Sequence, residues 1–146
     1  MEQSRKHLKI SSIVILIYAA ATLINLLTEI FLGELNSTEI PEGSPANILL
    51  IAKIILTVFS FIFLLPEIYV GLKGLKMAHN PDSSRLHILL AMILLGFTAV
   101  SMITPTIALF KGDSFGANLG DVLGMVLELF IYYDYVKYAR IVADEN

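Results

Sequence analysis

The chain contains no cysteine and no tryptophan. The absence of cysteine excludes disulfide bonds, thiol catalysis and cysteine-based metal sites. Its three histidines, His7, His79 and His87, are scattered and form no pair at helical spacing, so we expect no metal site and no cofactor. The sequence also lacks a credible Ser–His pair for hydrolysis and a phosphate-binding loop, and we therefore expect that the protein is not an enzyme.

Charged residues are scarce as well, at 16% of the chain, whereas apolar residues make up 56% and the mean hydropathy is +0.76. A water-soluble domain is usually about 45–50% apolar. The apolar residues of this chain gather in four runs, at residues 8–32, 47–72, 86–110 and 115–138. Each run exceeds the roughly 20 residues that cross a hydrocarbon core of about 30 Å. Because backbone polar groups in lipid must be satisfied internally, all four runs predict transmembrane helices.

The polar segments between these runs are short, so residues 1–146 predict a single transmembrane domain without a separate soluble domain. The expected fold is all-α, an integral membrane four-helix bundle with antiparallel up-down topology. Eight of the ten Lys and Arg residues then lie on one side of the membrane. Since positively charged residues stay in the cytoplasm, both termini are predicted to be cytoplasmic (N-in/C-in), with the protein in the plasma or cytoplasmic cell membrane.

Clusters of Lys and Arg also occur in nucleic-acid-binding proteins, which gives a competing interpretation of this charge. Here the positive residues lie at the ends of predicted spans, where membrane topology alone accounts for them. We therefore expect the lipid bilayer as a partner and no nucleic acid.

A glycine series on the last predicted span is the strongest local motif. Gly116, Gly120 and Gly124 recur at every fourth residue, and Glu128 and Tyr132 continue the series. Residues at this spacing share one helix face, and small residues let two helices approach closely in lipid, where no hydrophobic effect drives helix association. The motif predicts a helix-packing face that meets another helix, either within the protomer or across a dimer. We therefore expect a homo-oligomer or a complex with another membrane protein.

Glu128 lies within about 2 Å of the predicted midplane when each span is centred on the bilayer. A charged side chain at this depth costs at least roughly 2.5–3.5 kcal/mol, so we expect Glu128 to face protein and to carry a proton. Tyr18, Ser60 and Thr98 fall at a similar depth and are candidate hydrogen-bond partners. Two interpretations stay open: an exchangeable acid that serves function, or a neutral acid that holds helices together.

A second polar group is predicted in the outer leaflet. Lys53 and Asp121 both lie about 9 Å from the midplane, and Asn25 and Glu29 lie on the outer part of the first span. An ion pair between Lys53 and Glu29 or Asp121 would lower the cost of burying these charges. Such a pair could serve ion binding, or it could be a structural salt bridge that fixes helix register.

The second predicted span carries a polar face. It is formed by residues at every seventh position, with two further residues alongside: Lys53, Ser60, Glu67 and Gly74, then Thr57 and Gly71. We expect this face to point toward the other helices, with Glu67 near the inner end of the bundle together with Asp134 and Tyr132. The candidate ion- or proton-binding residues are Glu128, Lys53, Glu29, Asn25, Asp121 and Glu67.

Two prolines lie inside predicted spans, Pro66 in the second and Pro105 in the third. Each removes a backbone hydrogen-bond donor and tends to kink a helix. We expect these prolines to shape the helices rather than to form a hinge or a cation site. Thr104 and Thr106 are placed to cover the carbonyl group that Pro105 frees.

The gross plan of four short spans with a membrane-embedded Glu is similar to that of the small multidrug-resistance transporters. The resemblance covers topology only, because those proteins carry their essential Glu near the middle of the first span. Here the only acid of the first span is Glu29, near its outer end, and the midplane acid is Glu128 on the last span. The resemblance therefore assigns no functional residue.

Two functions from different classes fit this sequence. The first is a non-enzymatic membrane component that acts through helix–helix contacts, as an accessory, assembly or protective subunit. The second is a proton- or cation-coupled transporter or channel subunit for a small solute, with Glu128 as the exchangeable acid and Lys53 as its internal counter-ion. The small size of the chain and the lack of a diagnostic transport motif favour the first function.

Overall fold

The computed structural model describes residues 2–32, 46–81, 84–111 and 115–144, and all regular secondary structure in these ranges is helical. Five helical segments follow one another along the chain: α1 Glu2–Leu32, α2 Ala46–His79, α3 Leu86–Ser101, α4 Ile103–Lys111 and α5 Phe115–Asp144. Only Met102 separates α3 from α4, so the described chain forms four helical rods. The all-α prediction is confirmed.

Three of the rods contain segments that are long and apolar enough to cross a membrane: Glu2–Thr28, Thr57–His79 and Leu86–Lys111. They correspond to the first three predicted spans and are compatible with a small membrane protein. Residues 115–138 also lie in a helix, α5, but the crossing of a membrane by this helix stays a prediction. The same holds for the antiparallel order of the spans in a bilayer and for the cytoplasmic side of the termini.

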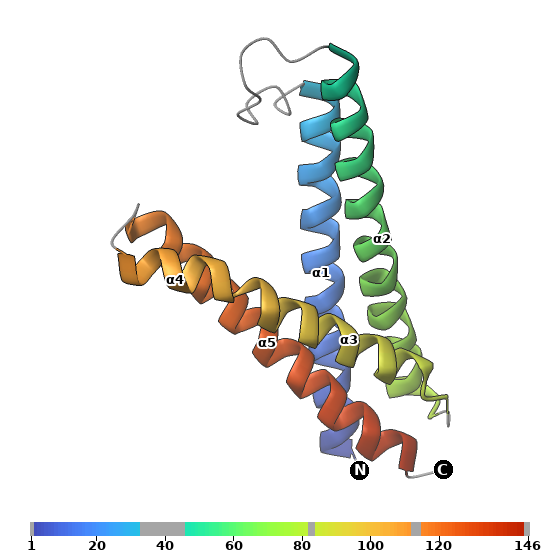
Figure 1. Cartoon of the computed structure of the whole chain (residues 1–146). Helices are drawn as coiled ribbons and strands as arrows, with labels where there is room; N and C mark the ends of the chain where they lie inside the picture. The colour runs from blue at the N-terminus through green and yellow to red at the C-terminus, as the bar shows by residue number, and fades with distance from the viewer. Residues whose placement is uncertain (1, 33–45, 82–83, 112–114, 145–146) are drawn as a thin grey trace.

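The four rods form two pairs, which meet at one end of the molecule and diverge from there (Figure 1). α1 packs against α2, and α3 and α4 pack against α5. Both chain termini lie at the end where the pairs meet. We call this common region the packed end, and we call residues 103–111 and 115–124, which leave it, the free arm. The rods therefore pack as a bundle at one end only, and a four-helix bundle over their whole length is not confirmed.

Apolar side chains from all four rods form the core of the packed end. They are Leu8 and Ile15 of α1, Val70 and Met77 of α2, Ile88, Ala91 and Leu94 of α3, and Tyr132, Tyr135, Val136, Ala139, Val142 and Ala143 of α5. Because lipid is as apolar as these side chains, close van der Waals packing holds transmembrane rods together. One polar contact adds to it: the buried Tyr135 hydroxyl of α5 donates a hydrogen bond to the Val70 carbonyl oxygen of α2 at 2.9 Å.

Two glycines of α2 allow α1 and α5 to approach closely at the packed end. A Cβ atom on Gly71 would lie 2.6 Å from Leu16 Cγ, and a Cβ atom on Gly74 would overlap Ser12 and the ring of Tyr135. Any side chain at either position would force its neighbours to move. For these two glycines, the prediction that the polar face of α2 points toward the other helices is confirmed.

The two prolines have different effects. Pro66 lies inside α2, which stays helical from Ala46 to His79. Pro105 follows the break between α3 and α4: it has no N–H to donate to the Ser101 carbonyl, and its ring crowds that carbonyl, so the helix is interrupted at Met102. Thr106 Oγ1 donates to the Met102 carbonyl oxygen at 2.6 Å. The prediction that Pro105 shapes its helix is confirmed.

Candidate functional site

Glu128 of α5 lies half-buried where the two helix pairs meet, and it has hydrogen-bond partners on two other helices. Thr98 Oγ1 of α3 donates to Glu128 Oε1 at 2.9 Å. The Tyr18 hydroxyl of α1 also hydrogen-bonds with the Glu128 carboxyl. The prediction that Tyr18 and Thr98 are partners of Glu128 is therefore confirmed, and one carboxyl group connects three of the four rods.

A second carboxyl group, that of Glu67 on α2, brings the remaining rod to the same place. The hydroxyl of the buried Tyr132 of α5 hydrogen-bonds with Glu67. The Glu67 Oε2 atom is buried and has no hydrogen-bond partner among the described residues. Glu67 and Glu128 are close enough to interact as like charges, so ionising both without a bound cation would cost free energy. We call these residues, Tyr18, Glu67, Thr98, Glu128 and Tyr132, the two-carboxyl site.

The proximity of Glu67 and Glu128 was not predicted from the sequence. The sequence placed Glu67 near the inner end of the bundle and Glu128 at the midplane. The reason lies in the arrangement of the helices. The prediction compared depths along parallel spans, whereas the two helix pairs meet at one end and diverge from there (Figure 1). Glu67 and Glu128 therefore line one pocket although their predicted depths differ.

Both carboxyl groups line a pocket of about 270 Å³ between α2, α3 and α5. Its lining residues are Phe63, Glu67, Leu94, Phe97, Thr98, Ser101, Met125 and Glu128. Within the described ranges, no three His, Asp or Glu side chains come together as a metal-binding group. The pocket instead has two acids and hydroxyl groups in apolar surroundings. This arrangement can hold a proton between two carboxyl groups, or a cation on carboxyl and hydroxyl oxygens.

The outer polar group predicted from the sequence is only partly described. Glu29 and Lys53 lie on α1 and α2, but their side chains are outside the described part of the structure. Asn25 of α1 and Asp121 of α5 are both exposed, and the helices that carry them diverge (Figure 1). The predicted ion pair of Lys53 with Glu29 or Asp121 therefore stays a prediction.

The glycine face of α5 differs from the glycines of α2. A Cβ atom on Gly116, Gly120 or Gly124 would meet no other described atom within 4 Å. No packing inside the protomer is therefore seen for this face in the part of the chain that the structure describes. The other predicted alternative, packing against a helix of a second chain, stays a prediction.

The helices and the two-carboxyl site together describe a small α-helical protein with three rods able to cross a membrane and a polar site where the rods meet. Comparison with protein-family models, with curated proteins and with solved structures finds no match. The proposed function therefore rests on the geometry of this chain alone.

Proposed function

We propose that this chain is a non-enzymatic component of a cell membrane, with both termini cytoplasmic, that acts through helix–helix contacts as an accessory, assembly or protective subunit. Its partner is a second copy of the chain or another membrane protein. One observation supports the proposal most directly: the free arm carries Gly116, Gly120 and Gly124 on a face that no described part of the chain covers.

Glycine in a helix carries a cost in free energy. Each glycine is about 0.8–1.0 kcal/mol less favourable than alanine in a helix interior. In lipid, the close approach of a second helix offsets this cost, as at Gly71 and Gly74 of α2. Without such a partner, Gly120 and Gly124, which lie in the interior of α5, would weaken this helix by roughly 2 kcal/mol with no compensating contact.

Asp121 gives a second reason to expect a partner. Its side chain is exposed on the free arm, one residue after Gly120. An exposed carboxylate in the hydrocarbon region would cost roughly 2.5–3.5 kcal/mol if it faced lipid. A helix packed on the neighbouring glycine face would shield Asp121 from lipid and could supply a hydrogen-bond donor.

The experiment compares Gly120→Leu with Gly96→Leu. Gly96 of α3 is a matched control, because a Cβ atom there also meets no described atom within 4 Å, but no glycine series surrounds it. Size-exclusion chromatography with light scattering, on protein extracted in native nanodiscs, measures the mass of each complex. We expect the wild type and Gly96→Leu to form the same larger complex and Gly120→Leu to fall to the monomer. A monomeric wild type, or an unchanged complex in Gly120→Leu, would contradict the proposal.

The pocket of the two-carboxyl site favours a second candidate function, a proton- or cation-coupled carrier or channel subunit. In this interpretation Glu128 is the exchangeable acid and Glu67 is the second group that shares its proton or cation. The supporting observation is that both carboxyl groups line one pocket, with hydroxyl groups of Tyr18 and Tyr132 as hydrogen-bond partners. Ionisable groups inside a membrane are functional candidates by default, because keeping them there costs free energy.

Liposomes that contain a pH-sensitive dye test this candidate. Wild-type protein is compared with Glu128→Gln and Glu67→Gln, and Glu2→Gln at the exposed N-terminus is the control for loss of an acid elsewhere. A carrier would conduct protons in the wild type and in Glu2→Gln but not in the other two variants. An absence of flux in the wild type under a pH gradient and a cation gradient would exclude the carrier and leave the two-carboxyl site as a structural contact.

A further inference from the structure

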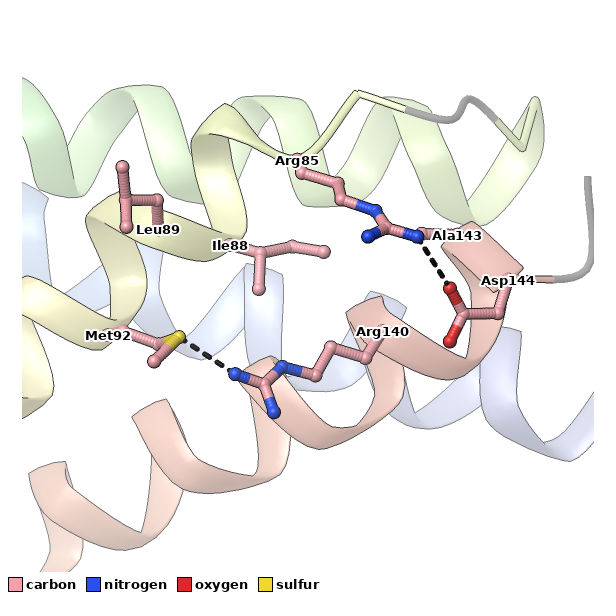
Figure 2. Close-up of a pocket in the computed structure, with 7 residues that line it drawn as sticks. All are labelled: Arg85, Ile88, Leu89, Met92, Arg140, Ala143 and Asp144. Carbon is pink, nitrogen blue, oxygen red and sulfur yellow. Dashed lines mark hydrogen bonds and ion pairs between the residues drawn. The ribbon is translucent and has the colours of Figure 1, made fainter.

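A second pocket lies away from the two-carboxyl site, between the start of α3 and the end of α5 (Figure 2). Its volume is about 380 Å³. Its lining residues are Arg85, Ile88, Leu89, Met92, Arg140, Ala143 and Asp144. The pocket thus combines two guanidinium groups with an apolar wall, and we call it the arginine pocket.

The two arginines have different contacts in this pocket. Arg85 Nη2 forms an ion pair with Asp144 Oδ1 at 3.1 Å, and both side chains are largely exposed. Arg140 Nη2 lies 2.9 Å from Met92 Sδ, and a thioether is a weak acceptor for a guanidinium donor. Figure 2 shows the guanidinium group of Arg85 turned toward Asp144 and that of Arg140 turned toward Met92, away from Asp144. Two positive charges and one negative charge leave the pocket with a net positive charge that suits an anion.

The position of the pocket along the helices indicates which anion it fits. Arg85 directly precedes the apolar segment Leu86–Lys111, and Arg140 lies two residues beyond the last predicted span. Both guanidinium groups are therefore expected at the level of the lipid headgroups. Leu89 and Met92 follow Arg85 into the apolar segment, and 54% and 41% of their surfaces are exposed. A ligand in this pocket meets the guanidinium groups of Arg85 and Arg140 together with the apolar side chains of Leu89 and Met92.

We propose that the arginine pocket binds an anionic phospholipid, with its phosphate group between Arg85 and Arg140 and an acyl chain along Leu89 and Met92. A guanidinium group donates two parallel hydrogen bonds to phosphate oxygens, which a neutral partner such as Met92 cannot match. Basic pockets at the cytoplasmic ends of transmembrane helices bind anionic lipid headgroups for the same reason. Asp144 competes with the phosphate for Arg85, so the carboxylate weakens binding without preventing it.

The experiment measures lipid binding to the delipidated protein, residues 1–146, by native mass spectrometry. The probes are phosphatidylglycerol, phosphatidylcholine as the zwitterionic lipid, and inorganic phosphate as the free anion. The variants are Arg140→Gln and Asp144→Asn, with Lys76→Gln as the control, because Lys76 is an exposed cation near the end of α2 and does not line the pocket.

We expect phosphatidylglycerol to bind more tightly than phosphatidylcholine. Its affinity should fall roughly fivefold in Arg140→Gln, as about 1 kcal/mol per basic residue near a lipid surface implies, and it should stay within twofold of wild type in Lys76→Gln. Asp144→Asn, which removes the competing carboxylate, should bind the lipid more tightly and keeps the test informative if Arg140→Gln does not fold. Equal binding of the two lipids, equal losses in Arg140→Gln and Lys76→Gln, or weaker binding in Asp144→Asn would overturn the proposal. Equally tight binding of inorganic phosphate would assign the pocket to a free anion and would overturn it as well.

Discussion

The packed end and the free arm both contain glycines within their helices, but only the glycines of the packed end are in close contact with neighbouring helices. At the packed end, Gly71 and Gly74 lie so close to α1 and α5 that no Cβ atom would fit. On the free arm, the glycines at positions 116, 120 and 124 have no described neighbour within 4 Å of an added Cβ atom. Glycine is thus used for helix contact in one region and has no described contact in the other. This difference supports the proposal that a second helix covers the free arm.

The largest expected effect comes from adding a side chain at the packed end. Gly74→Leu would push into Ser12 and the ring of Tyr135, and overpacking costs about 1–3 kcal/mol and occasionally more. Thermal unfolding in detergent, followed by circular dichroism, should show a lower midpoint or no folded protein. The control is Gly96→Ala, which should be neutral or stabilising by up to about 1 kcal/mol because it meets open space. Equal stability of the two variants would show that the close contact at Gly74 is absent.

A smaller loss is expected from Tyr135→Phe. This change removes the hydroxyl that donates to the Val70 carbonyl oxygen, and the loss of one buried hydrogen bond costs about 1 kcal/mol. Tyr133→Phe is the matched control, because Tyr133 is exposed on the same helix. The difference in free energy of unfolding between the two variants measures this contact, and a difference near zero would mean that apolar packing alone joins α2 to α5.

The contact between Thr98 and Glu128 should contribute less. Hydrogen bonds between transmembrane helices average about 0.6 kcal/mol, so Thr98→Val should lower stability by roughly this amount. A double-mutant cycle with Glu128→Gln separates the interaction energy between Thr98 and Glu128 from the other effects of either substitution. If Thr98→Val leaves proton flux intact in a protein that conducts, Thr98 holds Glu128 in place and takes no part in the transfer.

The smallest effect on folding is expected at the arginine pocket. The ion pair of Arg85 with Asp144 is exposed, and exposed pairs contribute about 0.2–1 kcal/mol that salt screens. Asp144→Asn should therefore lower stability by less than about 1 kcal/mol at low salt, and the difference should shrink at high salt. A larger loss that persists at high salt would show that this pair is part of the core.

The helical content, three segments able to cross a membrane and the partners of Glu128 could be predicted from the sequence. Long apolar runs permit only helices in lipid, and the depth of Tyr18 and Thr98 along those helices placed them beside Glu128. The divergence of the two helix pairs could not be predicted, because the apolar pattern along a transmembrane helix does not distinguish lipid from a neighbouring helix. The arginine pocket could not be predicted either. Membrane topology already accounts for Lys and Arg residues at the ends of spans, so their charge gives no separate signal of a binding site.

The central claim is that a second chain covers the glycine face of the free arm. Site-specific photo-crosslinking in native membranes tests it most directly, with a photoreactive amino acid at Leu123, which lies between Gly120 and Gly124 and is exposed. Val100 of α3, which is also exposed, serves as the control position. The account predicts a protein–protein adduct from position 123 and only lipid adducts from position 100. Lipid adducts alone from both positions, or protein adducts in equal yield, would contradict it.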